Sequence, residues 1–212
     1  MIHIQCKQGE PDWFAARLGS CTASRASDAC DTLKSGSPTK SAIAYAAQVA
    51  MESETHVACD DVFVNFAMKR GSELEPQARM AYEMATGNFV AESGIFLTDD
   101  KAFGYSSDGT IGDDGLIEIK CPLSALTVIS MWRDGDLSDY MHQMQFGLWL
   151  TGRKWCDFVM FDPRLRGVGK ALFIKRVARD ERFIEVMEAD LMRFAALVND
   201  NVSSVRGDAV AA

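Results

Sequence analysis

One short segment, residues 104–122, constrains the fold of this chain more than any other. It contains two runs with strong β-strand preference, separated at residues 112–115 by a Gly-Asp-Asp-Gly sequence typical of a tight turn. The two runs are therefore expected to form an antiparallel hairpin. In that hairpin Asp108, near the end of the first run, lies opposite Glu118 in the second run, to within about one residue of register.

The second strand of the hairpin alternates apolar and charged side chains. Side chains two positions apart on a strand point to the same face, so Glu118 and Lys120 emerge together while Ile117 and Ile119 share the opposite face. We expect the isoleucine pair to be buried and the charged pair to face outward. Two carboxylates and one ammonium group then converge near Asp108.

Two carboxylates beside a lysine suit metal-dependent cleavage of a phosphodiester. Magnesium prefers oxygen ligands, and two ions about 4 Å apart can stabilise both the attacking and the leaving oxygen. We expect Asp108 and Glu118 to bind magnesium, with manganese as a substitute and the backbone carbonyl of Ile119 as a further ligand. Lys120 would orient or deprotonate the attacking water, and its protonation state stays open. An exposed hairpin held by salt bridges is the alternative interpretation.

The composition is that of an ordinary soluble protein. The 212 residues suit one domain, and 48% of them are hydrophobic and 25% charged. There is no run of about 18 apolar residues that would span a membrane, and no secretory signal. The six cysteines include no C-x-x-C pair, which argues against a zinc site. We therefore expect a single cytoplasmic domain, residues 1–212, without a membrane partner.

The net charge of −8 is unusual for a protein that binds a polyanion, because contacts to phosphates require Lys and Arg. The charges are unevenly distributed along the chain. Residues 153–182 contain nine Lys and Arg against four Asp and Glu, a local excess of five positive charges. This basic segment is either a surface that binds nucleic acid or a solvated charged face, and charge alone does not decide between them.

The chain divides into a part with helical signals, about residues 1–87, and a part expected to carry the catalytic sheet, about residues 88–200. Helices are predicted over 11–18, from 22, over 39–51 and over about 63–86. The tail, residues 201–212, is expected to be frayed. In the second part, strands are predicted at 89–91, 95–97, 104–110, 116–121, 155–161 and 171–177, and helices over 123–132, 137–150 and 183–198.

Five motifs occur one after another between residues 13 and 164. They are WFAARLGSCTAS at 13–24, RGSELEPQAR at 70–79, the hairpin segment at 106–122, YMHQMQFGLW at 140–149 and FDPR at 161–164. Together they make the sequence similar to the lambda exonuclease family, the YqaJ-type viral recombinases of the PD-(D/E)xK nuclease superfamily. The resemblance implies an α/β fold with a restriction-endonuclease-like core, in which helices flank a mixed central sheet.

The resemblance also implies roles for individual residues. Asp108, Glu118 and Lys120 match the catalytic set of the family. Glu75 matches an acidic residue that helps to build the metal site, although Glu73 is a nearby competitor. Gln143 matches a residue that contacts the metal waters or the substrate, and a buried amide between helices is its alternative role.

A pocket for a terminal 5′-phosphate is implied as well, at Arg17, Ser24 and Ser106. An arginine can bind a phosphate through two parallel hydrogen bonds, and hydroxyls near a helix start add donors. An arginine paired with a carboxylate and a serine acting as a helix cap are the alternative roles. The chain departs from the family at Ser107, where the family usually has proline before the catalytic aspartate.

The activity implied by the resemblance is magnesium-dependent degradation of linear double-stranded DNA from the 5′ end, which leaves a 3′ single strand. The family further implies a homotrimeric ring around the DNA and a partner that anneals single strands. Two other functions remain open: a sequence- or structure-specific endonuclease with the same metal site, and a recombination scaffold without activity.

Overall fold

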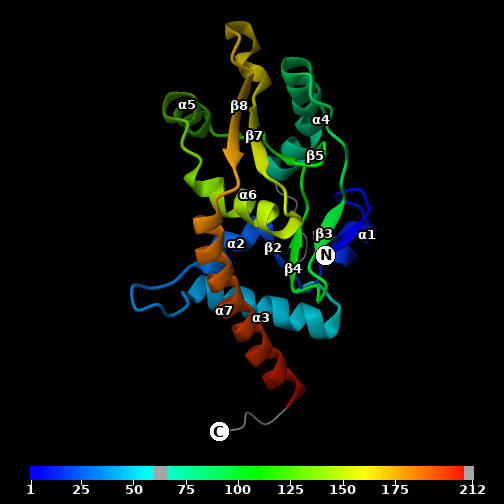
Figure 1. The fold of residues 1–212 in the computed structure, drawn as a ribbon, viewed down its shortest axis with the longest axis vertical. Coiled ribbons are helices and arrows are strands. Elements are labelled where there is room, and N and C mark those ends of the chain that lie inside the picture. Colours follow the sequence, from blue (N-terminus) through cyan, green and yellow to red (C-terminus); the bar gives the residue numbers. More distant parts are fainter. Residues whose placement is uncertain (60–65, 208–212) are drawn as a thin grey trace.

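The computed structural model describes residues 1–59 and 66–207. It confirms a mixed α/β fold in which helices flank mixed sheets (Figure 1). The helices are α1 (Pro11–Arg17), α2 (Ala26–Cys30), α3 (Lys40–Thr55), α4 (Phe66–Thr86), α5 (Ala125–Asp134), α6 (Ser138–Thr151) and α7 (Glu181–Arg206), with short 3-10 helices η1 (Ala23–Arg25) and η2 (Pro163–Val168). The strands are β1 (Ile2–Ile4), β2 (Cys21–Thr22), β3 (Ile95–Leu97), β4 (Phe103–Tyr105), β5 (Gly109–Ile111), β6 (Gly115–Lys120), β7 (Trp155–Phe161) and β8 (Leu172–Ala178).

Local sequence signals explain where the N-terminal helices begin and end. Pro11 opens α1, because the first helical position needs no backbone donor. At the start of α3, the Thr39 hydroxyl accepts a hydrogen bond from the backbone N–H of Ala42 at 3.3 Å. Gly19, which follows α1, has a φ of 72°, and a Cβ there would lie 2.7 Å from the Cα of Ser53. Only glycine therefore allows the end of α1 to approach α3 this closely.

The strands form two four-stranded sheets, in the orders β1-β3-β4-β2 and β5-β6-β7-β8. Both sheets are mixed: β2 pairs with β4 and β6 with β7 in parallel, and the other neighbours are antiparallel. The crossover that a parallel pair requires is supplied by α5 and α6 between β6 and β7. The first sheet takes β1 and β2 from residues 1–87, which the sequence predicts to be mainly helical.

The single strand predicted over residues 104–110 is in fact two strands. β4 ends at Tyr105 in the first sheet, and β5 begins at Gly109 in the second sheet. The intervening residues 106–108 carry the chain from one sheet to the other. The prediction of a strand at 89–91 is also wrong, since this run contributes one isolated bridge to β5.

Helices cover both faces of the second sheet (Figure 1). α4 packs on the face that carries Ile117 and Ile119, and α6 lies on the opposite face within the larger apolar cluster. The predicted burial of the two isoleucines is confirmed. The prediction that Glu118 faces outward is wrong: its residue surface is 1% exposed, because α6 covers that face of β6. The Lys120 side chain retains 29% exposure at the end of the strand.

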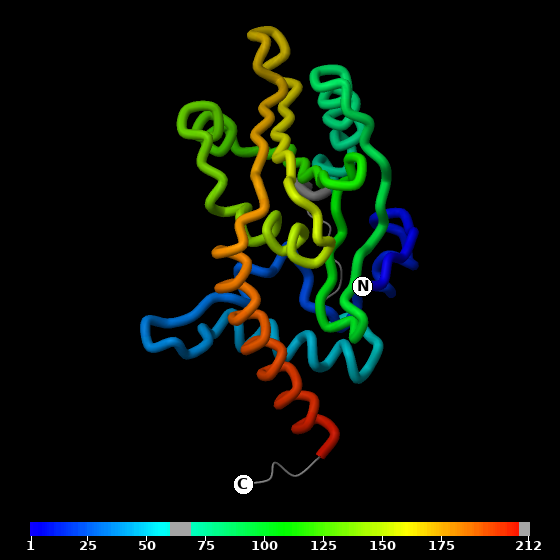
Figure 2. The backbone as a smooth tube through the Cα atoms, viewed as in Figure 1, coloured from blue at the N-terminus to red at the C-terminus, as the bar shows by residue number. Residues whose placement is uncertain are grey.

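The last helix crosses α3, so that segments far apart in the sequence lie side by side (Figure 2). Arg206, at the end of α7, forms an ion pair with Glu54 of α3 at 2.8 Å. Gly207 ends the helix in the left-handed conformation. Residues 201–206 are therefore helical rather than frayed as the sequence predicts, and the rest of the expected frayed tail, 208–212, lies outside the described residues.

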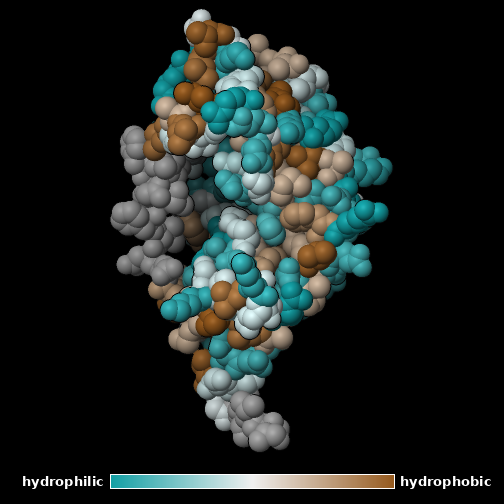
Figure 3. All heavy atoms as spheres, turned by 90° about the vertical axis from the view of Figure 1, so that its left-hand side faces the viewer, coloured by the Kyte–Doolittle hydropathy of each residue, from teal (hydrophilic) through white to brown (hydrophobic). Residues whose placement is uncertain are grey.

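The surface is a mixture of hydrophilic and hydrophobic side chains on the face that Figure 3 shows. Exposed apolar residues are spread over several elements, such as Leu126 and Ile129 on α5 and Val168 in η2. Apolar side chains scattered in this way are normal for protein surfaces. Among the described residues, no helix combines the length and the apolar character needed to cross a membrane.

Candidate active site

The β5–β6 hairpin brings the predicted acids together as the register requires. Gly109 pairs with Ile117, so Asp108 lies opposite Glu118. The carboxylate of Asp108 accepts a hydrogen bond from the backbone N–H of Ile119 at 2.6 Å. This bond fixes Asp108 against the strand that carries Glu118, at the point where the chain crosses between the two sheets.

One carboxylate oxygen of Glu118 is fully engaged and the other is not. Its Oε1 accepts hydrogen bonds from Nζ of Lys120 and from Nε2 of Gln143, both at 2.6 Å. Gln143, on α6, also accepts from Lys120 through its Oε1 at 3.3 Å. The second oxygen, Oε2, is buried without a hydrogen-bond partner. A buried carboxylate oxygen without a donor is costly unless something positive reaches it.

The third acid, Glu75, comes from α4. It is half-buried and accepts a hydrogen bond from Arg79 at 3.2 Å, whereas the competing Glu73 is exposed. Glu75 lines a cleft together with Asp108, and Glu73 does not. Of the two candidates, Glu75 is therefore the one that the fold directs toward the hairpin.

The three acids influence one another electrostatically. Burial and the negative charges of Glu118 and Glu75 raise the pKa of Asp108 well above its usual range. Burial likewise raises the pKa of Glu75, against the opposing effect of Arg79. Burial disfavours the charged form of Lys120, but the carboxylates of Glu118 and Asp108 outweigh it and raise the pKa of this lysine. Without a bound cation, Lys120 is therefore protonated at neutral pH.

The donor set fits a hard divalent cation. Among the described residues, no three His, Cys, Asp or Glu side chains are grouped closely enough to hold a metal by themselves. The side chains available are the carboxylates of Asp108 and Glu118, and the unpartnered Oε2 of Glu118 is a free acceptor for a cation. A site with few protein ligands suits magnesium, which keeps several of its waters.

A cleft of about 1500 Å³ extends from Asp108 and Glu75 to Arg17, whereas Glu118, Ser24 and Ser106 are not among the residues that line it. Asp108, Glu75 and Arg79 line the cleft on the side of the hairpin and α4. Arg17 and Thr22 line it on the side of α1 and β2. The same open volume therefore borders two of the predicted acids and the predicted phosphate-binding arginine.

The predicted phosphate-binding residues are linked through Trp13 and Thr22. The guanidinium of Arg17 lies 4.3 Å from the centre of the Trp13 ring, and it donates to the Thr22 hydroxyl at 3.3 Å. Ser106 accepts a hydrogen bond from the indole N–H of Trp13 at 2.7 Å. The hydroxyl of Ser24, an exposed residue, is 3.4 Å from that of Thr22.

Arg17 has no carboxylate within ion-pair distance in the described part of the chain, so its charge is available to an anion. Burial lowers its pKa from the ordinary arginine value, as expected for a desolvated cation. Trp13 and Thr22 have no role in the sequence prediction. Their position beside Arg17 and Ser24 in the first motif was the available signal.

The basic segment is mainly engaged in internal contacts. Arg153 donates to the carbonyls of Gly112 and Gly115, both at 2.8 Å. Ion pairs hold four more of its basic residues: Lys154 to Asp114, Arg164 to Asp162, Arg176 to Asp157 and Arg179 to Glu181. These contacts favour a structural role for much of the segment, and a role in DNA binding stays a prediction.

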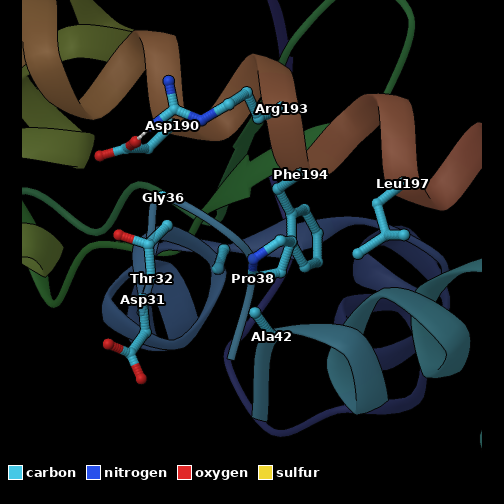
Figure 4. A pocket seen from close by; sticks show the side chains of 10 residues that line it. Asp31, Thr32, Gly36, Pro38, Ala42, Asp190, Arg193, Phe194 and Leu197 are labelled. Carbon is cyan, nitrogen blue, oxygen red and sulfur yellow. Dashed lines mark ion pairs between the residues drawn. The ribbon is translucent and has the colours of Figure 1, made fainter. Parts of the chain in front are cut away.

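A second, small pocket lies away from the acids, between the segment after α2 and α7 (Figure 4). Its volume of about 40 Å³ accommodates little more than water. Asp190 and Arg193 form an ion pair at its edge, and Phe194 and Pro38 line it. It therefore offers no alternative to the cleft as a substrate site.

Comparisons with known proteins agree with the resemblance of the five motifs. Residues 12–154 match the YqaJ-like viral recombinase domain. The crystal structure of an alkaline exonuclease, LHK-Exo, from Laribacter hongkongensis is 38% identical, with a TM-score of 0.83 over 93% of this chain and 97% of that one. LHK-Exo in complex with dAMP is 37% identical, with the same TM-score and coverage.

A phage-related exonuclease from Haemophilus somnus 129PT shares the fold, with a TM-score of 0.70 and 15% identity over 88% of this chain and 96% of that one. A search of curated proteins finds no significant match. Both the family match and the 38% identity extend over most of the chain. The chain therefore belongs to the YqaJ-like viral recombinase domain family and is a homologue of an alkaline exonuclease.

Proposed function

We propose that the protein is a metal-dependent exodeoxyribonuclease that degrades linear double-stranded DNA from its 5′ ends. The observation that carries this proposal is the state of Glu118, whose Oε1 is held by Lys120 and Gln143 while its buried Oε2 has no donor. A bound cation would interact favourably with this oxygen. It would also offset the negative charge that, together with burial, raises the pKa of the neighbouring Asp108. Homology to an alkaline exonuclease supports the same chemistry.

Each proposed catalytic residue has a role that its contacts allow. Asp108, Glu118 and the carbonyl of Ile119 would hold magnesium. The family resemblance implies two ions per active site, and manganese could replace magnesium. When bound, the metal would stabilise the charge that develops on the phosphate and lower the pKa of attacking water. Gln143 fixes the Glu118 carboxylate and orients Lys120.

Lys120 would act on the water and on the phosphate. In the absence of metal it holds its proton against Glu118 at 2.6 Å. Where the carboxylate charges are neutralised, the pKa of Lys120 would fall, so that the lysine could lose its proton to solvent and then accept one from the attacking water. Glu75 completes the acidic side of the cleft from α4.

The proposed direction of degradation, from the 5′ end, rests on residues on the α1 side of the cleft. Arg17, with no carboxylate partner in the described residues, would bind the terminal 5′-phosphate together with Ser24 and Ser106. Since Arg17 and Asp108 line one cleft, a 5′ end bound there would present an adjacent phosphodiester to the acids. The dAMP in the LHK-Exo complex is the kind of mononucleotide that such a reaction releases.

Further parts of the proposal come from the family alone. They are a homotrimeric ring around the DNA, a 3′ single strand passed to an annealing protein for recombination, and a cytoplasmic location. A ring would help to reconcile the net charge of −8 with DNA binding, because basic groups could line its channel while acidic groups face outward.

A comparison of linear duplex DNA with covalently closed circles of the same sequence tests the proposed function. We expect linear DNA to be degraded with magnesium and to persist with EDTA, while the circles stay intact. Circles cut as fast as linear DNA would instead identify an endonuclease. No digestion of either substrate would support a scaffold without activity.

A further inference from the structure

Arg79 on α4 links two of the proposed catalytic acids. Its Nη2 donates to the carboxylate of Glu75 at 3.2 Å and to the backbone carbonyl of Asp108 at 3.0 Å. Its Nη1 reaches the exposed Glu92 at 3.5 Å. One guanidinium thus ties a helix that packs on the second sheet to the residue at which the chain crosses between the sheets.

Asp108 is held through both its side chain and its backbone. The side chain of Asp108 is held by the backbone N–H of Ile119, and its backbone is held by Arg79. Glu75 lies one helical turn before Arg79, so the arginine fixes the distance between α4 and the hairpin as well as the Glu75 rotamer.

Stability alone does not account for this arrangement. The Nε of Arg79 is buried without a hydrogen-bond partner, and an unsatisfied buried donor lowers the stability of the fold. The Arg79 side chain is 20% exposed, in the same cleft as the acids. The positive charge of Arg79 would also repel a metal ion. The groups that Arg79 holds in place therefore explain its presence better than its charge does.

We propose that Arg79 is a positioning residue that sets Glu75 and Asp108 in the geometry that binds the metal, an inference that rests on the proposed function. It acts through these two residues and not by contact with DNA. Loss of a group that orients metal ligands commonly lowers metal affinity by about 10- to 100-fold. Loss of a nearby positive charge has the opposite effect, because it favours a cation.

Two variants distinguish a positioning role of Arg79 from an effect of its charge on magnesium affinity. Arg79→Lys keeps the charge but loses the planar fork that reaches both Glu75 and Asp108. Arg79→Gln loses the charge as well. If position matters, both variants bind magnesium about tenfold or more weakly. If charge alone matters, Arg79→Lys binds like the wild type and Arg79→Gln binds more tightly.

Magnesium binding is measured by calorimetry on the full chain without DNA, so that the readout does not depend on nuclease activity. Arg153→Lys is the matched control, because Arg153 also donates twice to backbone carbonyls, at the turn end of the same hairpin. We expect this control to keep the wild-type magnesium affinity. Thermal melting verifies that each variant is folded.

A double-mutant cycle tests whether Arg79 acts through Glu75, with Arg79→Gln in place of Arg79→Lys if thermal melting shows that the lysine variant is poorly folded. If Arg79 acts through Glu75, adding Arg79→Lys to Glu75→Gln lowers magnesium affinity much less than Arg79→Lys does in the wild type. Full additivity, or wild-type affinity in Arg79→Lys, would overturn the proposal while leaving the nuclease site intact. Absence of magnesium binding by the wild type would instead remove the proposed function and this inference together.

Discussion

Replacement of Asp108 by asparagine is expected to lower magnesium-dependent DNA degradation by about 10³-fold or more, and to make the metal-free protein more stable. The loss of activity follows from removing a proposed metal ligand. The gain in stability follows from the raised pKa of Asp108, which results from burial and from repulsion by Glu118 and Glu75. Asparagine can still accept the hydrogen bond from the backbone N–H of Ile119.

The sign of the pH dependence follows from the direction of this shift. A carboxyl group whose pKa is raised by folding favours the folded state at low pH, and this contribution is lost as pH rises toward the folded pKa. The difference in melting temperature between Asp108→Asn and the wild type should therefore be small near pH 4 and grow as pH rises. Melting curves in EDTA measure it.

Asp113→Asn is the matched control, because Asp113 is an exposed acid in the turn of the same hairpin. We expect neither activity nor the pH dependence of melting to change. Magnesium should stabilise the wild type and the control but not Asp108→Asn. An Asp108→Asn protein that digests linear DNA at the wild-type rate would exclude Asp108 from the mechanism.

Replacement of Arg17 by alanine is expected to remove the preference for 5′-phosphorylated ends. Hydrogen bonds to charged groups contribute about 1.5–3 kcal/mol, so the loss corresponds to about 10- to 150-fold in the rate on phosphorylated duplexes. On 5′-hydroxyl duplexes the variant and the wild type should degrade DNA at similar rates, because the phosphate that Arg17 would bind is absent.

Arg25→Gln is the control for this experiment. Arg25 lines the same cleft, but Asp28 and Gln48 already engage its guanidinium at 2.8 and 3.0 Å. We expect this variant to retain the preference for a 5′-phosphate. Equal loss on phosphorylated and hydroxyl ends in Arg17→Ala would mean that Arg17 supports the fold around Trp13 rather than binding the phosphate.

The hairpin was predictable because its geometry is local. Side chains along β6 alternate between the two faces of the sheet, and the turn at 112–115 sets the register of the hairpin. The observed pairing of Gly109 with Ile117 agrees with the predicted register. Burial of Glu118 was not predictable in this way. It depends on α6, which packs over the strand from a later part of the chain and brings Gln143 to its carboxylate.

The arrangement around the hairpin depends on contacts that sequence spacing does not encode. The Ser-Ser-Asp-Gly run at 106–109 is a local signal of a break between β4 and β5. It does not reveal that the two strands belong to different sheets, because that depends on their pairing with distant segments. Arg79 could have been linked to Glu75 from their spacing of four residues on a helix. Its bond to the backbone of Asp108 could not, since it joins α4 to a distant segment.

The most direct measurement uses linear duplexes that carry a label at either the 5′ or the 3′ end, with 5′-phosphate or 5′-hydroxyl termini. If the cleft binds a 5′ end and the acids cut beside it, the 5′ label should be released first. Release should require magnesium and should be faster for phosphorylated ends. A 3′ label should stay attached to fragments that shorten progressively from their 5′ ends, and its own release should come late. Early release of the 3′ label, or equal release with EDTA, would contradict this account.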